Sequence, residues 1–418
     1  MGKAARAIKA ATVAREGAKG KALIEQIGDS RHRELVIAFC GQAGSGVSSV
    51  ARKLSNVLES RHHYKKPLYI TMSKLILETL DKANEVEGVD KFTYIKKLQA
   101  FGKELRKTKK DNSILAQLAV QKIHVYRKDV YGDDTKESPR FVTIIDSLKR
   151  EEEYQLLEAV YGDIFYLVGV LCPEDTRINR LKKTKGVTAS MASDIIEIDR
   201  DEQDEYGQKV MKTLEHSDFF INNMSSNEEV IIPQLERFAD IVLSNTRLTP
   251  TIGEYAMALA HTASLRSGCL SRQVGAAIVT QEGDVISTGR NDPPKPGGGL
   301  YCCDDGMKDS RCSKLHDNIC FNSKKRDEIK SEIAGIVEKS LTPYLKEEKQ
   351  RPSREDILKI ISMAADIPSL RGLTEFSRSI HAEMDAITTA ARNGFGKLKR
   401  ARLYCTTYPC HNCARHIV

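Results

Sequence analysis

Three residues, His381, Cys410 and Cys413, constrain this chain more than any other feature, because together they can hold one metal ion. His381 opens the triplet His-Ala-Glu, and the two cysteines belong to the run Pro-Cys-His-Asn-Cys that begins at Pro409. One imidazole and two thiolates are typical zinc ligands, and three protein ligands leave the fourth tetrahedral position open, as catalytic sites do. Glu383 remains beside the metal, so the pattern predicts a zinc centre with its own acid–base group.

The residues around these ligands indicate where each of them would lie. An apolar pattern with helical periodicity follows His381 and stops at Asn393-Gly394, which is typical of a helix end. Residues 402–407 predict a short strand, and Pro409 is a favourable first residue for a second helix. We therefore expect His381 and the cysteine pair each at a helix N-terminus, where the helix dipole favours thiolates.

This order of motifs is the signature of the zinc-dependent nucleobase deaminases. In that chemistry the metal activates a water, and Glu383 takes the proton of that water. Glu383 then passes the proton to the ring nitrogen beside the attacked carbon and later protonates the leaving ammonia. A structural Cys/His cluster or a chance Cys-x-x-Cys is the alternative, which the complete order and spacing disfavour.

Residues 251–418 also resemble the deoxycytidylate deaminase family. Residues 273–279 resemble the first strand of that family, and residues 287–291 resemble the second. The resemblance implies that Asn291 contacts the deoxyribose of the substrate, whereas the alternative is that Asn291 merely starts a turn. Among the arginines that flank these strands, Arg272 is the first candidate for binding the phosphates of the substrate.

Length and composition are consistent with a multidomain enzyme of the cytoplasm. The chain has 418 residues, of which 40% are hydrophobic, so two or three domains are expected. The net charge of +8 suits anionic partners such as nucleotides, phosphates or RNA. No apolar run is long enough to cross a bilayer, so we expect no membrane partner. The ten cysteines are not spaced like a disulfide framework, which fits a reducing compartment.

The N-terminal half carries a modified P-loop. Residues 35–40 predict a buried strand that runs directly into a glycine-rich loop. The candidate nucleotide-binding residues of this loop are Gly41, Gly44, Gly46, Ser48 and Ser49. They match the spacing G-x-x-x-x-G-K-[ST], except that Val47 stands in place of the lysine. The loop can still hold a nucleoside triphosphate with Mg²⁺ at Ser48, but its cation is missing unless Arg52 or Lys53 substitutes.

The residues that follow predict a parallel α/β sheet, because strands alternate with helical stretches. Residues 141–146 form a strand ending in an acid, which is compatible with a Walker B aspartate. Residues 176–181 resemble the basic lid of nucleotide kinases, and residues 216–223 resemble a late strand of that fold. An active kinase and a kinase-like regulatory module that binds nucleotide or RNA are the two interpretations. The missing lysine favours the regulatory module.

These patterns divide the chain into three parts. Residues 1–30 predict a basic flexible tail, residues 31–245 a P-loop kinase-like domain, and residues 251–418 a deaminase domain. The predicted fold class is α/β, with an N-terminal parallel sheet and a C-terminal cytidine-deaminase-like α/β/α domain. Since Val418 lies barely one turn into the helix of the cysteine pair, we expect the deaminase domain to be incomplete. We accordingly expect residues 1–418 alone to bind zinc poorly and to turn over little.

Between Asn291 and His381 lies a long insertion that is rich in cysteine and predicts a second, structural zinc. Its candidate ligands are Cys303, Cys312, His316 and Cys320. Cys302 is an alternative to Cys303 in this set. Unpaired surface thiols are the alternative interpretation of the whole cluster.

A P-loop kinase-like domain fused to a cytidylate deaminase resembles the bacterial anti-phage deoxycytidylate deaminases, over nearly the whole chain. The resemblance implies that free dCTP and dCMP become dUTP and dUMP, which starves phage replication. It also implies a regulatory small RNA as a partner and assembly into a homo-oligomer. Two alternatives remain: a deaminase that acts on cytosine or adenine bases within RNA or DNA, and an RNA-regulated nucleotide-binding module whose deaminase is inactive.

Overall fold

The chain folds into two compact units, residues 1–248 and residues 249–418, in the computed structural model. The predicted linker at 244–250 spans this division. The predicted tail at 1–30 lies outside the described residues. The structure describes residues 34–62, 64, 67–131, 141–183, 187–201, 205–225, 227–243, 248–315, 318–341, 353, 355, 356, 359, 377–394 and 398–418.

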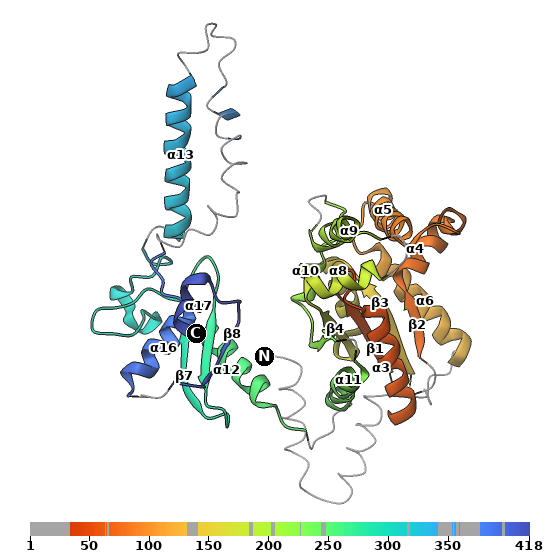
Figure 1. The fold of residues 1–418 in the computed structure, drawn as a ribbon, viewed down its shortest axis with the longest axis horizontal. Helices are drawn as coiled ribbons and strands as arrows, with labels where there is room; N and C mark the ends of the chain where they lie inside the picture. The colour runs from red at the N-terminus through yellow and green to blue at the C-terminus, as the bar shows by residue number, and fades with distance from the viewer. Residues whose placement is uncertain are drawn as a thin grey trace, which may run out of the picture. The chain divides into compact units, whose positions relative to one another are not determined.

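The N-terminal unit is built on a five-stranded sheet with the order β2-β3-β1-β4-β5 (Figure 1). Every neighbouring pair in this sheet is parallel, which confirms the predicted α/β class. The strands are β1 (Glu34–Cys40), β2 (Leu68–Thr71), β3 (Phe141–Leu148), β4 (Phe165–Leu171) and β5 (Phe219–Asn222). The glycine-rich loop follows β1, the central strand, and leads into α3 (Val47–His62).

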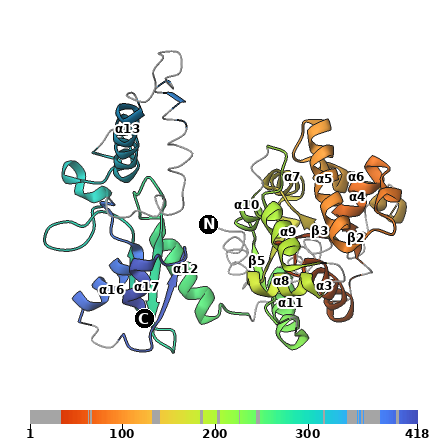
Figure 2. The ribbon, with the colours of Figure 1, turned by 45° about the horizontal axis from the view of Figure 1, so that its top comes forward.

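Helices cover both faces of this sheet because the buried side chains of β1 alternate between two apolar cores. Leu35, Ile37 and Phe39 pack with α3 and α11 (Glu228–Val242), which lie side by side (Figures 1 and 2). Val36, Ala38 and Cys40 face the other core. The helices on that second face are α4 (Met72–Leu80), α5 (Lys91–Lys109), α6 (Ile114–Tyr131), α7 (Glu151–Tyr161) and α10 (Val210–Leu214). The remaining elements are α8 (Glu174–Lys182), α9 (Ala189–Asp201) and the short helices η1 (Ala83–Val86) and η3 (Gly162–Ile164).

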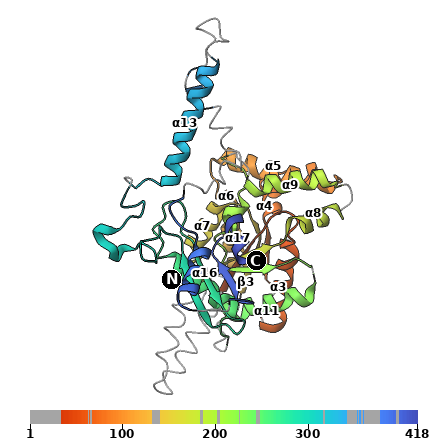
Figure 3. The same cartoon turned by 60° about the vertical axis from the view of Figure 1, so that its left-hand side comes forward.

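The C-terminal unit contains a three-stranded antiparallel sheet with β6 in the middle. Its strands are β6 (Gly275–Val279), β7 (Val285–Arg290) and β8 (Arg402–Cys405). Its helices are α12 (Ile252–Ser264), α13 (Phe321–Leu341), α16 (Ala382–Arg392), α17 (His411–Ile417) and the short η4 (Cys303–Lys308). Helices α12 and α16 both pack on this sheet, and α16 contacts α17 (Figures 1 and 3).

Two glycines let these helices approach the sheet closely. A Cβ atom on Gly275 would lie 1.9 Å from the backbone oxygen of Ala260 in α12. A Cβ atom on Gly289 would lie 2.2 Å from the backbone oxygen of Ala382 in α16. Both distances are far below van der Waals contact, so only glycine fits at either position. The second glycine sets the position of α16, whose first turn carries the predicted catalytic residues.

No described helix has the length and hydropathy that a bilayer crossing requires.

Candidate metal centre and active site

His381 stands at the start of α16, as the sequence predicts. It is the N-cap residue, with an extended backbone (φ −80°, ψ 152°), and its carbonyl accepts a hydrogen bond from the Asp385 amide at 2.9 Å. The helix is fixed to β7 by the Ser287 hydroxyl, which donates to the Ala386 carbonyl at 2.8 Å. Glu383 therefore lies in the first turn, where the helix dipole favours a carboxylate, and its side chain is buried.

The two cysteines come from the next helix in the chain. Cys410 is the N-cap of α17, and Cys413 lies in its first turn and is buried. The segment before them is held to β6, because the Gly275 amide donates to the Thr406 hydroxyl at 3.1 Å. The Thr406 amide donates back to the Gly275 carbonyl at 3.0 Å.

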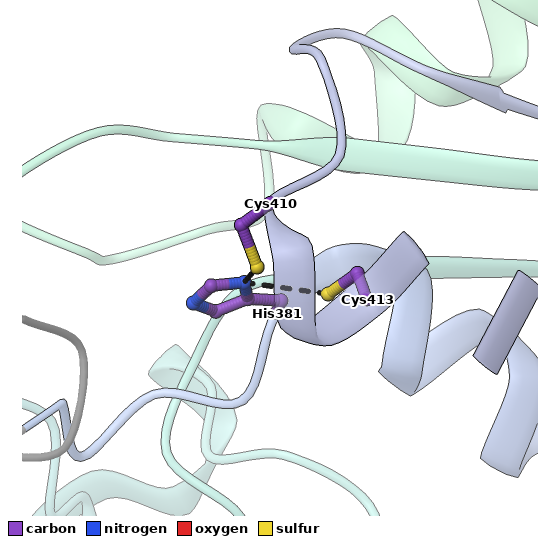
Figure 4. Close-up of side chains that lie close together, drawn as sticks. All are labelled: His381, Cys410 and Cys413. Carbon is purple, nitrogen blue, oxygen red and sulfur yellow. Dashed lines mark hydrogen bonds between the residues drawn. The ribbon is translucent and has the colours of Figure 1, made fainter. Parts of the chain in front are cut away.

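These elements bring His381, Cys410 and Cys413 together (Figure 4). Nδ1 of His381 lies 3.2 Å from Sγ of Cys410 and 3.4 Å from Sγ of Cys413. All three ligand atoms lie within 4.8 Å of one another. No other group of three His, Cys, Asp or Glu side chains is as close in the part of the chain that the structure describes. The donor set suits zinc, and it leaves one tetrahedral position for a water or substrate.

Glu383 contacts the thiols around this cluster without belonging to it. Burial raises the pKa of the Cys413 thiol, and the nearby Glu383 carboxylate raises that pKa further. Burial also raises the pKa of Cys405 to about 11, and Glu383 adds to this shift. Without a cation these buried sulfurs are therefore neutral thiols, so a zinc ion would have to displace protons in order to bind.

A cavity of about 230 Å³ opens beside the metal ligands. Its wall includes the predicted metal ligands His381 and Cys410, the predicted acid–base residue Glu383, and the predicted substrate-binding residues Arg272 and Asn291. Cys413 is buried and is not part of this wall. The structure thus places the predicted substrate-binding candidates and the predicted chemical residues around one space.

Asn291 is held firmly at this wall. Its Oδ1 atom accepts hydrogen bonds from the Val274 amide at 2.7 Å and the Ser267 hydroxyl at 2.9 Å. Its Nδ2 atom donates to the Arg272 carbonyl at 2.7 Å, which leaves one N–H of the amide group. Asn291 thus orders the loop before β6, in addition to any contact with substrate.

Asp292, the next residue, is fully buried and ties together the segments that frame the cavity. Its carboxylate accepts hydrogen bonds from the Gly268 amide and from Nε of Arg290, each at 3.0 Å. Its carbonyl accepts from the Ile380 amide at 3.2 Å, immediately before the first metal ligand. Burial raises the pKa of this carboxyl, and the Arg290 guanidinium opposes that shift. The sequence analysis did not single out this residue.

The cavity wall also includes residues that sequence reasoning missed. These are chiefly Arg378, Phe321, Asn322 and Tyr408. Arg378 precedes His381 by three residues, so its proximity to the motif was an available signal. Phe321 opens α13 within the long insertion, and no local pattern connects it to the metal ligands.

The second zinc stays a prediction. Of its four candidate ligands, His316 lies outside the described residues. Cys303 is exposed, and its Sγ atom accepts from Nη2 of Arg311 at 3.2 Å. Cys312 and Cys320 instead line the cavity, which places the cysteine-rich insertion at the wall of the candidate active site.

The glycine-rich loop of the N-terminal unit has the backbone that its sequence predicts. Gly44 and Gly46 have positive φ angles of 80° and 86°, which only glycine adopts readily. Val47 is buried in the core with α3, whereas Ser48 and Ser49 are exposed at the start of that helix. The candidate Walker B residue Asp146, in β3, accepts a hydrogen bond from the Tyr69 hydroxyl at 3.0 Å.

Residues 250–418 match the family model of the cytidine and deoxycytidylate deaminase zinc-binding region. This part of the chain is therefore similar to a deaminase zinc-binding region, and the His and Cys residues brought together here are its candidate Zn²⁺ ligands. No curated protein matches the chain at a significant level.

Solved structures that resemble the chain are aligned with about half of it. TT1252 from Thermus thermophilus is 13% identical with a TM-score of 0.31, over 52% of this chain and 100% of that one. Shikimate kinase from Acinetobacter baumannii, in complex with shikimate, is 12% identical with a TM-score of 0.31, over 53% and 99%. A gluconokinase from Sinorhizobium meliloti is 14% identical with a TM-score of 0.28, over 52% and 99%. We assign the P-loop kinase-like fold of the N-terminal unit from the strand order of its parallel sheet and from the glycine-rich loop after β1.

Proposed function

We propose that this chain hydrolytically deaminates free deoxycytidine nucleotides, dCTP or dCMP, to the corresponding deoxyuridine nucleotides. The observation that carries the proposal is the cluster of His381, Cys410 and Cys413 beside a buried carboxylate and a cavity. A zinc ion at three such ligands lowers the pKa of a water towards neutrality and so supplies a nucleophile.

Glu383 is the group that moves protons in this proposal. It takes a proton from the attacking water and delivers it to the ring nitrogen next to the carbon under attack. It then takes the remaining proton of that water, from the hydroxyl now on the carbon, and gives it to the departing amine, so that ammonia leaves and the carbonyl forms. Its place in the first turn of α16, buried and in contact with Cys405 and Cys413, puts its carboxylate beside the candidate metal ligands. His381, Cys410 and Cys413 hold the metal and take no part in proton transfer.

The cavity supports a free nucleotide as the substrate. A volume of about 230 Å³ is small for a drug-sized ligand and suits a pyrimidine base with part of its sugar. Arg272 and Arg378 at its wall supply positive charge for phosphates, and Asn291 retains one N–H for a sugar hydroxyl. A base within RNA or DNA is the alternative substrate, because the same metal chemistry serves both.

We further propose the setting that the fusion of the two domains suggests. Deamination would deplete deoxycytidine nucleotides in the bacterial cytoplasm during phage infection. A small RNA would hold the enzyme inactive, and the enzyme would act as a homo-oligomer. The net charge of +8 is consistent with such an anionic partner.

A second proposal concerns the N-terminal unit. Its glycine-rich loop, with Gly44 and Gly46 at positive φ and a helix of 16 residues behind it, favours binding of the phosphates of a nucleoside triphosphate. Ser48, exposed at the start of α3, is the candidate for contacting Mg²⁺. Since Val47 offers no charge, we assign this site to binding and regulation rather than to phosphoryl transfer.

The decisive experiment is a deamination assay on the full chain with dCTP, dCMP and cytosine-containing RNA and DNA oligonucleotides. We expect uracil products from the free nucleotides, and deamination of oligonucleotides alone would refute the proposed substrate class. Glu383→Gln should keep its zinc and lose about a hundredfold or more in turnover. Glu282→Gln, an exposed residue in the turn between β6 and β7, is the matched control. Equal turnover by the two variants would remove Glu383 from its assigned role.

A further inference from the structure

Two buried polar atoms at the glycine-rich loop lack hydrogen-bond partners among the described residues. Oγ of Ser45, in the middle of the loop, is buried and has no hydrogen-bond partner among the described residues. The same holds for Nη1 of Arg177, a buried residue of α8 whose backbone packs against Gly44. Buried donors are almost always satisfied in folded proteins, so two at one loop indicate a place for an acceptor.

One acceptor already reaches this loop from inside the protein. Oδ2 of Asp199, near the end of α9, accepts a hydrogen bond from the Ala43 amide at 2.7 Å. The same carboxylate accepts from Nζ of Lys149, with Oδ1 at 2.8 Å and Oδ2 at 3.0 Å. Asp199 is almost fully buried, so its negative charge is stabilised by the loop amide and by the ammonium of Lys149 rather than by water.

Lys149 supplies the positive charge that position 47 lacks. It follows β3 directly, and its Nζ atom donates to the Gly41 carbonyl at 3.2 Å, at the first residue of the loop. About a quarter of its side chain is exposed (24%), so the ammonium group is accessible from solvent. Its bond to Gly41 would keep the ammonium at the loop if the carboxylate were to leave.

We propose that Asp199 is an internal occupant of the glycine-rich loop, and that a phosphate ligand displaces it and takes over Lys149 as its cation. The ligand class is a polyphosphate, such as pyrophosphate or the phosphates of a nucleotide. This inference rests on the phosphate binding proposed above for the loop. Displacement exchanges one carboxylate for a group with more negative charge and more acceptor oxygens, which can also satisfy Ser45 and Arg177.

The rest of the loop is held by contacts that do not involve Asp199. Nη1 of Arg180 donates to the Ser45 carbonyl at 3.1 Å, and Nδ2 of Asn223 donates to the same carbonyl at 2.7 Å. The outer side of the loop should therefore keep its shape when Asp199 leaves. A purely structural contact between α9 and β3 is the competing explanation of the Asp199–Lys149 pair.

Binding of inorganic pyrophosphate to the full chain, measured by titration calorimetry, separates the two explanations. Asp199→Asn keeps the size of the side chain and removes its charge, so it should tighten binding by about tenfold or more. Asp194→Asn, an exposed change on the same helix, should leave the affinity unaltered. Adding Lys149→Met to Asp199→Asn should bring the affinity below that of the wild type.

Each other outcome overturns the proposal in a distinguishable way. Wild-type binding that Asp199→Asn does not tighten, or tight binding that survives Lys149→Met, refutes the displacement and leaves phosphate binding at the loop intact. Absence of binding in every variant refutes both. The deaminase proposal is tested separately, since its readout is uracil formation at the other unit.

Hydrogen exchange on the wild-type protein tests the proposal without any substitution. Pyrophosphate should slow exchange at the loop amides 41–46 and speed exchange at the end of α9, where Asp199 is released. Slower exchange at both segments would mean that Asp199 stays in place, and would overturn the displacement.

Discussion

A buried cysteine is stable as a neutral thiol and unstable as an anion, and Cys413 shows this at the metal centre. Burial raises the pKa of its thiol, and the Glu383 carboxylate raises that pKa further. A zinc ion reverses this preference, since its charge stabilises the thiolate that binds it. The same carboxylate therefore opposes the thiolate when no metal is bound, and is the proposed acid–base group when zinc is bound.

Cys413→Ser should consequently remove most of the zinc from the protein. A serine hydroxyl is a weak zinc ligand, so the metal content should fall far below that of the wild-type protein. Cys405→Ser is the matched control, because Cys405 also contacts Glu383 but is not one of the three clustered ligands. Elemental analysis of both purified variants checks this, and loss of zinc from Cys405→Ser alone would contradict the assignment.

A buried ion pair at the cavity wall gives a prediction with a defined pH dependence. Nη2 of Arg311 donates to Oδ2 of Asp309 at 2.7 Å, and both side chains are buried. The Arg311 guanidinium holds the pKa of the Asp309 carboxyl below its usual range. Because the folded-state pKa is the lower one, this pair stabilises the fold above the unfolded pKa of about 3.9. The stabilisation is lost as the pH falls through the folded-state pKa.

Asp309→Asn should therefore destabilise the protein by about 3–5 kcal/mol near neutral pH, since it leaves Arg311 buried and unpaired. The difference from wild type should shrink at pH 3, which lies below the unfolded-state pKa of about 3.9. Urea unfolding at the two pH values measures both effects, with the exposed Asp284→Asn as the control. A difference that does not depend on pH would show that the charge of Asp309 is not responsible.

At the scale of the secondary-structure elements, the packing of α16 on β7 positions the chemistry. A Cβ atom on Gly289 would lie 2.2 Å from the Ala382 oxygen and 2.3 Å from the Ala386 nitrogen, so α16 would have to move. Gly289→Ala should therefore cost about 1–3 kcal/mol or more, and should weaken zinc binding because His381 begins this helix.

Gly335→Ala in α13 is the matched control for that substitution, because no heavy atom lies within 4 Å of its Cβ position. It should leave zinc binding unchanged and stabilise the helix by up to about 1 kcal/mol. Thermal unfolding and zinc content, measured on both variants, check the pair. A Gly289→Ala protein that is as stable as the wild type would contradict the close approach.

Some of these elements can be predicted from the sequence because their signals are local. The starts of α16 and α17 follow from ligand spacing, the proline and the helix-end residues, all within a few positions of one another. The predicted strand at 273–279 begins instead at Gly275, since the Val274 amide bonds to the Asn291 side chain rather than to a neighbouring strand. The Asp199 contacts escaped prediction because they join residues 50 and 156 positions apart, and no local pattern reports such pairs.

For the whole molecule, each unit has its own apolar core, and the clustered metal ligands belong to one of them only. A ligand that binds only the folded state stabilises it, and the stabilisation grows with the logarithm of the ligand concentration over its Kd. Removing zinc with a chelator should therefore destabilise residues 249–418 and leave the protection of residues 34–243 unchanged. Hydrogen exchange followed by mass spectrometry, with and without the chelator, measures the protection of each unit separately. Equal loss of protection in both units would show that they unfold together.

The middle position of β6 has a consequence for the order in which the living cell can build this centre. β6 pairs with β7, which precedes His381, and with β8, which follows it. A growing chain thus presents the imidazole and the acid–base glutamate first, when a single ligand holds zinc only weakly. The two sulfurs arrive after β8 has been synthesised and can close the sheet. Metal capture is then the last step in the maturation of the centre, and a chain that is terminated before β8 has the glutamate but lacks the two sulfur ligands.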